Sequence, residues 1–88
     1  DNQKKNDKIK CWTENGRICI EVSDFYRGKE FRLQITDLSG RVIGMEDCIV
    51  DSYRLLSETI LSMPGAYFIQ AIDKETDVTV LQTRCIAN

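Results

Sequence analysis

Histidine is absent from this chain, which also has one proline and five glycines among its 88 residues. Without histidine, the chain lacks the usual general base at neutral pH and the most common metal ligand in proteins. Hydrolytic triads that use histidine are therefore excluded. The chain also has no glycine-rich loop of the kind that binds phosphate groups. We therefore expect a protein that is not an enzyme and that binds no cofactor.

Long apolar runs and an excess of basic residues are missing as well. No apolar run approaches the roughly 20 residues that a membrane-spanning helix needs, so we expect no membrane span. Lys and Arg together number 12 against 14 for Asp and Glu, which gives a formal net charge of −2. This balance does not provide the basic surface that phosphate contacts require. Nucleic acid is therefore not an expected partner.

The first ten residues, DNQKKNDKIK, are polar and contain no apolar core of a signal peptide. This composition fits a mature N-terminus after processing as well as a cytosolic start, and it is typical of a flexible tail. We expect residues 1–8 to form such a tail and residues 9–88 to form a single domain. A domain of this size has a thin core, because it buries roughly 60–65% of its unfolded surface.

Short runs with β-type composition, separated by turn residues, make up the rest of the chain. Residues 31–36 read FRLQIT, in which apolar and polar side chains alternate as in a half-buried strand. Strands are predicted over residues 9–13, 17–22, 31–37, 41–50, 53–57, 66–73 and 78–86. The segment YRLLSETILSM has roughly helical spacing before Pro64, which leaves open one helical turn near residues 58–61. Seven short strands predict an all-β, antiparallel, immunoglobulin-like β-sandwich.

Two turns are predicted from glycines that follow polar residues. Asn15 and Gly16 lie between apolar runs and predict a type I′ hairpin turn, which needs positive φ at both central positions. In the segment DLSGR, Leu38 and Ser39 are placed at the centre of a type I turn. Gly40 then adopts the left-handed conformation and makes a bulge.

A third turn is predicted at the segment MPGA, residues 63–66. Pro64 fixes φ at the second position and Gly65 supplies positive φ at the third, which together indicate a type II turn. The strand that follows begins with Tyr67 as its first inward residue. In immunoglobulin-like sandwiches, a tyrosine at the start of strand F bonds its hydroxyl back to the preceding loop. Tyr67 is our candidate for that role, and a simple packed core aromatic is the alternative.

Two segments together resemble the C-terminal sorting domains of the type IX (Por) secretion system. They are FRLQITDLSGRVIG and ILSMPGAYFIQAID, which carry an Asp-x-x-Gly-Arg turn and then a Leu, Gly, Tyr pattern with one additional residue before the glycine. The motif residues here are Asp37, Gly40 and Arg41 in the first segment and Leu61, Gly65 and Tyr67 in the second. The chain also resembles small, stand-alone exported proteins of unknown function with an immunoglobulin-like sandwich.

The resemblance implies an exported protein, located in the periplasm or at the cell surface. It implies a non-catalytic interaction or structural module. The alternative is a C-terminal sorting or anchoring domain of a larger type IX-secreted protein.

The four cysteines, Cys11, Cys19, Cys48 and Cys85, include no Cys-x-x-Cys pair. A zinc ribbon and a redox motif are therefore not expected. In the predicted hairpin, Cys11 and Cys19 lie on opposite faces and should not bond to each other. A bridge from Cys11 to Cys85 would close a long loop and add roughly 4 kcal/mol. Reduced, partly buried thiols are the other state, and the sequence slightly favours them.

Three carboxylates, Asp73, Glu75 and Asp77, alternate around a predicted hairpin tip. A solvated turn is favoured over a weak calcium site, because true calcium loops converge more oxygen ligands. We therefore expect no bound metal.

Partner binding is expected at a sheet edge. The last predicted strand, residues 78–86, is β-branched and contains no proline or lysine that would discourage pairing. Its candidate edge residues are Thr79, Leu81 and Thr83, and its expected partner is a second copy or a strand of another protein. Exposed aromatics would also suit a partner, but in so small a domain we expect them to complete the core. The aromatics concerned are Trp12, Phe25, Tyr26 and Phe68.

Overall fold

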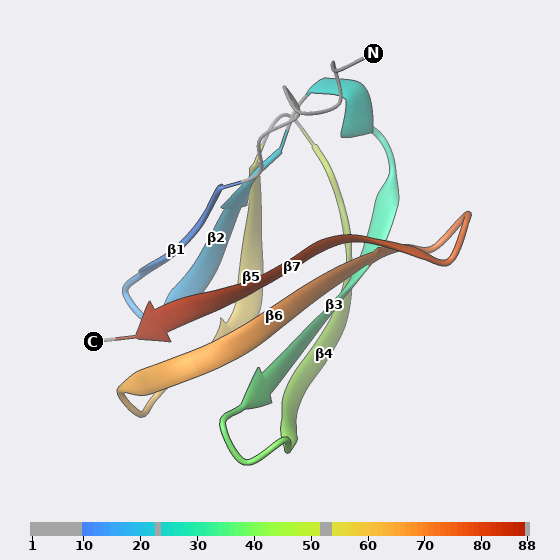
Figure 1. Ribbon diagram of the computed structural model, residues 1–88. Helices are drawn as coiled ribbons and strands as arrows, with labels where there is room; N and C mark the ends of the chain where they lie inside the picture. The colour runs from blue at the N-terminus through green and yellow to red at the C-terminus, as the bar shows by residue number, and fades with distance from the viewer. Residues whose placement is uncertain (1–9, 23, 52–53, 88) are drawn as a thin grey trace.

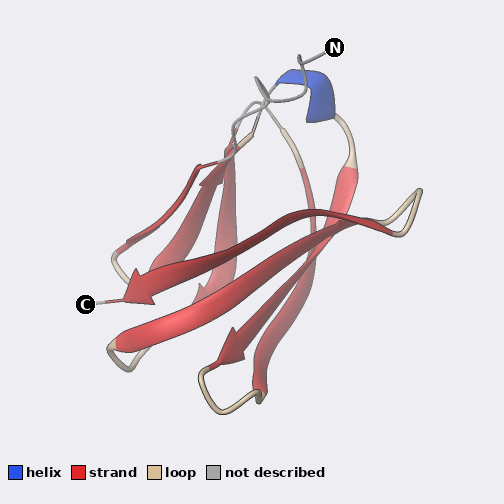
Figure 2. Cartoon of the chain, viewed as in Figure 1, coloured by secondary structure: helices blue, strands red, loops and turns tan. Residues whose placement is uncertain are grey.

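Seven strands form two antiparallel sheets in the computed structural model, which describes residues 10–22, 24–51 and 54–87 (Figure 1). The strands are β1 (Lys10–Glu14), β2 (Arg17–Glu21), β3 (Glu30–Asp37), β4 (Val42–Ile49), β5 (Arg54–Ile60), β6 (Gly65–Asp73) and β7 (Val78–Ala87). One sheet has the order β1-β2-β5 and the other has the order β4-β3-β6-β7. Within the described residues, the short 3₁₀ turn η2 (Asp24–Tyr26) is the one helical element (Figure 2). The all-β class and the seven strands predicted from the sequence are confirmed.

The observed strands differ from the predicted ones mainly at their ends. The tail predicted for residues 1–8 lies outside the described residues. Ile9 and Tyr53, at the starts of two predicted strands, also lie outside them. β4 is one continuous strand inside the predicted range 41–50, although its register with β3 shifts near Gly44.

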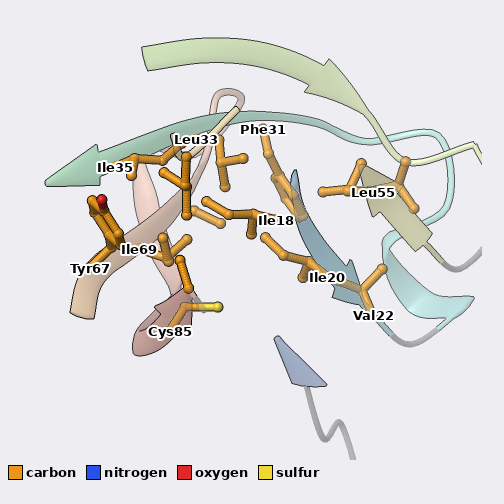
Figure 3. Packing of buried hydrophobic residues seen from close by; sticks show 14 residues of the cluster. Ile18, Ile20, Val22, Phe31, Leu33, Ile35, Leu55, Tyr67, Ile69 and Cys85 are labelled. Atoms are coloured by element: carbon orange, nitrogen blue, oxygen red, sulfur yellow. The ribbon is translucent and has the colours of Figure 1, made fainter. Parts of the chain in front are cut away.

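The two sheets enclose one apolar core, because strands of both sheets turn alternate side chains inward (Figure 3). Phe31, Leu33 and Ile35 of β3 are fully buried, as the alternation in that segment predicted. They pack toward Ile18 and Ile20 of β2 in the opposite sheet. Full burial of each such side chain contributes about 1.5–3 kcal/mol, so these contacts hold the sheets together.

The helical turn left open for residues 58–61 is wrong, because that segment belongs to strand β5 and the residue after it. Leu55 and Ser57 point inward and are buried, whereas Leu56 between them is 46% exposed. This alternation has the period of two that belongs to a strand. The apparent helical spacing arose because two adjacent leucines face opposite sides of one strand.

The side chain of Ser57 supplies a hydrogen bond at a point where the pairing of β2 and β5 is irregular. The pairing register shifts between Arg17 and Cys19, so the Ile18 N–H has no regular ladder partner there. The Ser57 hydroxyl accepts a hydrogen bond from that N–H at 2.9 Å and donates one to the Thr59 carbonyl at 2.8 Å. A buried backbone donor is thereby satisfied inside the core.

The hairpin between β1 and β2 has the geometry that Asn15 and Gly16 predicted. Their φ angles are 52° and 80°, both positive as a type I′ turn requires. The turn also packs against the end of β5, where the Leu61 N–H donates to the Gly16 carbonyl at 2.7 Å. A Cβ at Gly16 would lie 3.2 Å from the Ile60 side chain. Glycine is therefore needed at this position for both conformation and space.

Candidate functional site

β7 lies at one edge of the four-stranded sheet and, within the described residues, pairs with β6 alone. β1 of the other sheet reaches β7 near its C-terminal end. There the Thr13 hydroxyl donates to the Ile86 carbonyl at 3.2 Å, and Cys11 contacts Cys85. Figure 1 shows the hairpin between β6 and β7 extending away from β1. We call residues 78–83 the open half of β7.

The direction of the backbone groups along β7 follows from the bond at Ile86. In an antiparallel strand, the N–H and C=O of one residue point to the same side, and those of the next residue point to the other. The Ile86 carbonyl points away from β6, because it accepts the hydrogen bond from Thr13. Arg84 and Gln82, two and four residues earlier, therefore also present their backbone groups to the edge.

A bulge changes this alternation in the open half of β7. The register with β6 shifts between Ala71 and Ile72, which pairs with Thr79. The Lys74 N–H donates to Glu30 on the β3 side, so even-numbered residues of β6, including Ile72, face β3. The backbone of Thr79 therefore points away from β6, and the edge-facing positions of the open half are Thr79 and Gln82.

The three edge residues predicted from the sequence are thus not equivalent. Thr79 presents its backbone groups to the open edge. Leu81 and Thr83 pair with Ala71 and Ile69 of β6 on the hydrogen-bonding side, so their backbone groups are used inside the sheet. Whether the three residues contact a partner stays a prediction, and the sequence does not show which alternate residues of a strand direct their backbone groups toward the neighbouring strand.

An open hollow of about 610 Å³ lies on the outer face of the sheet beside β7. It spans three strands and is lined by Thr36 of β3, Phe68 and Gln70 of β6, and Gln82 and Arg84 of β7. Phe68 is 45% exposed, so the expectation that it completes the core is wrong. The hollow places an aromatic ring, amides and a guanidinium next to the edge-facing backbone of Gln82.

The edge strands β4 and β5 of opposite sheets lie against each other and form the β4–β5 seam. The carboxylate of Glu46 on β4 accepts hydrogen bonds from the N–H of Glu58 at 2.9 Å and the N–H of Thr59 at 3.0 Å. The Thr59 hydroxyl donates to the same carboxylate at 2.8 Å. One side chain thereby satisfies two edge donors of β5. The sequence carries no local signal for this role, because it depends on a contact between sheets.

Gly44 permits the close approach of the two strands at the β4–β5 seam. A Cβ at this position would lie 2.8 Å from the Thr59 hydroxyl oxygen and 3.4 Å from the Ile35 side chain. Its role is therefore steric, and unlike the turn glycines it does not have a positive φ. The seam closes this edge of the fold to other strands.

The β1–β7 seam closes the opposite side with weaker polar contacts. It consists of the bond from Thr13 to Ile86 and the contact between the Sγ atoms of Cys11 and Cys85, which are 3.8 Å apart. Cys85 is buried and Cys11 is half-buried. Burial raises the pKa of Cys11 to about 12, and the neighbouring Cys85 adds to this effect. Cys11 is therefore in the thiol form at neutral pH when it is reduced.

The segment with the Asp-x-x-Gly-Arg pattern forms a turn around the carboxylate of Asp37. That carboxylate accepts bonds from the Ser39 hydroxyl at 2.7 Å and from the N–H groups of Ser39 and Arg41, each at 3.0 Å. These bonds, led by the Ser39 hydroxyl, hold the pKa of Asp37 below its usual value. Gly40 has a φ of 90°, and its N–H donates to the Asp37 carbonyl at 3.0 Å. The structure thus has the predicted turn with its left-handed glycine.

Tyr67 lies at the start of β6 and bonds back to the preceding loop. Its hydroxyl donates to the Met63 carbonyl at 2.6 Å, while the residue as a whole is 7% exposed and belongs to the core cluster. The tyrosine is therefore a packed core aromatic whose hydroxyl also bonds back to the preceding loop. Gly65 has a positive φ of 141°, but this exceeds the roughly 80° of a type II turn, and the residue already begins β6 after Pro64. The predicted turn type is therefore wrong, although the sign of φ is as predicted.

The Asp37 turn and the loop before Tyr67 lie side by side at one end of the molecule. Asp37 pairs directly with Tyr67 across β3 and β6. A cavity of about 300 Å³ lies between the two segments. Its lining includes Ser39 and Arg41 of the first segment and Pro64 of the second. The two motif segments, which are distant in sequence, thus form one surface.

The two remaining cysteines occupy separate places. Cys19 lies on the outer face of its sheet, where it pairs with Trp12 and accepts a contact from Arg54 at 3.2 Å. Cys48 lies on β4, with its sulfur 3.8 Å from the Phe31 carbonyl. Burial raises the pKa of Cys48 to about 11. The register confirms that Cys11 and Cys19 lie on opposite faces.

The acidic hairpin tip has local contacts of its own. Asp73 is buried, and its carboxylate accepts a hydrogen bond from the Glu75 N–H at 2.9 Å. No group of three or more potential metal ligands occurs among the residues that the structure describes.

Among residues 10–22, 24–51 and 54–87, no helix is long and apolar enough to cross a membrane. Comparison with protein-family models, curated proteins and solved structures found no match to this chain.

Proposed function

We propose that this chain is an immunoglobulin-like module that binds a protein strand at the open half of β7. The strand order supports the first part, because β1-β2-β5 and β4-β3-β6-β7 correspond to A-B-E and C′-C-F-G of such sandwiches. The bond from the Tyr67 hydroxyl at the start of β6 to the Met63 carbonyl also supports it, because a tyrosine corner on strand F makes a bond of this kind.

The single observation that carries the binding function is the free hydrogen-bonding side of β7. Thr79 and Gln82 direct backbone groups to an edge at which no strand of the described residues pairs. An added strand gains main-chain hydrogen bonds there, and side chains beside it give specificity. The hollow around Phe68 and Arg84 lies on the face that a partner's side chains would share.

The other edges support this assignment by contrast. β5 has two edge donors taken by Glu46, and β4 lies against β5 at the same seam. β1 is a five-residue strand that lies against the end of β7. In this proposal the module presents one edge and acts without catalysis, and the resemblance of its motifs to exported proteins favours a location in the periplasm or at the cell surface.

Proline at Gln82 tests the proposal. The substitution Gln82→Pro removes an N–H that faces the edge and should leave the fold intact, since edge strands tolerate proline at such positions. Sedimentation velocity at several concentrations measures self-association, and a displayed peptide library supplies foreign strands. We expect bound copies or peptides to be lost with Gln82→Pro and retained with Gln82→Ala, which keeps the N–H.

Two results would contradict the proposal that a protein strand binds at the open half of β7. One is a wild-type chain that stays monomeric and captures no peptide. The other is capture that persists in a folded Gln82→Pro variant. Thr83→Pro serves as the orientation control: its N–H bonds to β6, so this variant should lower the melting temperature strongly.

A second function, sorting or anchoring of a larger type IX-secreted protein, is favoured by a different observation. The two segments that resemble the sorting motifs meet at one surface, with Asp37 opposite Tyr67. Fusion of this chain behind a secreted reporter in a bacterium with a type IX system tests this function. Reporter at the cell surface, reduced by Asp37→Asn, supports sorting, whereas reporter retained in the periplasm refutes it.

A further inference from the structure

We infer that Cys11 and Cys85 form a disulfide that joins the two sheets at the β1–β7 seam. The sequence alone slightly favoured reduced thiols, and the placement of these two residues changes that balance. The inference is independent of what binds at the open half of β7.

The geometry brings the two sulfur atoms together from opposite sheets. Cys11 and Cys85 are 74 positions apart in the chain, and their Sγ atoms lie 3.8 Å from each other. A disulfide has an S–S distance of about 2.05 Å, so the sulfurs need to approach by roughly 1.8 Å. The bond therefore requires rotation of the two side chains and a small shift of the seam. The bond from Thr13 to Ile86 holds the two strands in position.

Other pairings are disfavoured by the same geometry. Cys19 lies on the outer face of its sheet, between Trp12 and Leu56 in the neighbouring strands, and faces away from Cys11. Cys48 lies on β4, and its sulfur contacts the Phe31 carbonyl rather than another thiol. The four cysteines thus divide into one facing pair and two separate thiols.

Formation of the bond needs a disulfide oxidant, such as oxidised glutathione or a thiol–disulfide oxidoreductase. The thiolate of one cysteine attacks a sulfur of the oxidant, forms a mixed disulfide and expels one oxidant thiolate. The second cysteine, after losing its proton, attacks the protein sulfur of the mixed disulfide and expels the other half of the oxidant. Two protein thiols lose two protons and two electrons, and the oxidant disulfide becomes two thiols.

The environment of Cys11 determines when this exchange occurs. Burial raises its pKa to about 12, so the folded chain holds very little of the reactive thiolate. Exchange is therefore slow in the folded protein and faster in the unfolded chain, where the thiol has its ordinary pKa. A bond formed during folding becomes a structural link with limited access for reductant, because Cys85 is buried and Cys11 is half-buried.

Refolding the full chain from denaturant in reduced and oxidised glutathione tests the inference. Free thiols are then alkylated, and the digested chain is analysed by mass spectrometry. We expect two of the four free thiols to disappear and a cross-linked peptide to contain Cys11 and Cys85. The oxidised chain should melt at least about 10 °C higher than the same chain after reduction.

Two cysteine variants distinguish the Cys11–Cys85 disulfide from oxidation of the other cysteines. Cys48→Ala should keep the cross-link and the rise in melting temperature, whereas Cys11→Ala should lose both. Because the wild-type chain is compared with itself before and after reduction, the test does not depend on a variant that folds. A folded chain that keeps four thiols, a cross-link between another pair, or adducts with glutathione alone would overturn the inference.

Discussion

At the β4–β5 seam, one carboxylate accepts hydrogen bonds from two backbone N–H groups and a hydroxyl, whereas the β1–β7 seam has one hydroxyl bond and a sulfur contact. Both seams join edge strands of opposite sheets. In the first, Glu46 satisfies the edge donors of β5, and Gly44 lets the strands approach. In the second, Thr13 bonds to β7 at Ile86, and no strand of the described residues pairs with the open half of β7 on its outer side. A single well-placed acceptor can therefore close a strand edge. Where the described residues provide no such acceptor, as along the open half of β7, the backbone groups remain available for the proposed partner strand.

Removal of the Glu46 carboxylate should have the largest effect. Glu46→Ala leaves three donors without their acceptor, and hydrogen bonds to charged groups contribute about 1.5–3 kcal/mol each. Because the Glu58 N–H is exposed to water, we expect a total loss of about 2–3 kcal/mol in the free energy of unfolding. Denaturant titration measures it. Glu46→Gln keeps one carbonyl oxygen and should lose less, and equal losses in both variants would contradict this account.

A methyl group at Gly44 should have the next largest effect. Gly44→Ala places a Cβ against the Thr59 hydroxyl, and overpacking of this kind costs about 1–3 kcal/mol. The second substitution Thr59→Ala removes the obstructing atoms, so the two changes should couple in a double-mutant cycle. Additive losses would show that the seam tolerates the methyl group without contact to Thr59.

The hydrogen bond of the Tyr67 hydroxyl lies outside both seams, so its removal gives a reference value against which the seam variants can be compared. Tyr67→Phe removes the donor to the Met63 carbonyl and keeps the packed ring. We expect a loss of about 1 kcal/mol, the usual value for one neutral hydrogen bond. This loss should be smaller than that of Glu46→Ala. Thermal unfolding, followed by circular dichroism, measures the difference between the two variants.

The Thr13 hydroxyl should have the smallest effect. Thr13→Val keeps the shape of the side chain and removes the bond to the Ile86 carbonyl, which can then bind water. We expect a change in the free energy of unfolding below about 0.5 kcal/mol, as is usual at partly exposed positions. A loss as large as that of Glu46→Ala would show that the two seams are equivalent.

The sequence predicted the features that depend on neighbouring residues. Alternation in residues 31–36 and the Asn15–Gly16 turn depend on local backbone preferences, so they predicted the strands and hairpins. Glu46 and Ser57 gave no such signal, because their hydrogen-bond partners come from distant strands. The direction of the backbone groups of Thr79 and Thr83 likewise could not be predicted from the sequence, since it depends on a bulge and on the register with β6.

The bulge in β7 also bears on aggregation. A long, regular strand edge can template the addition of copy after copy into a fibril. In β7 the backbone groups that face outward come three residues apart, at Thr79 and Gln82, whereas a regular strand spaces them by two. An incoming regular strand therefore stays in register on one side of the bulge only. The edge is suited to a short partner, and it resists open-ended stacking of copies.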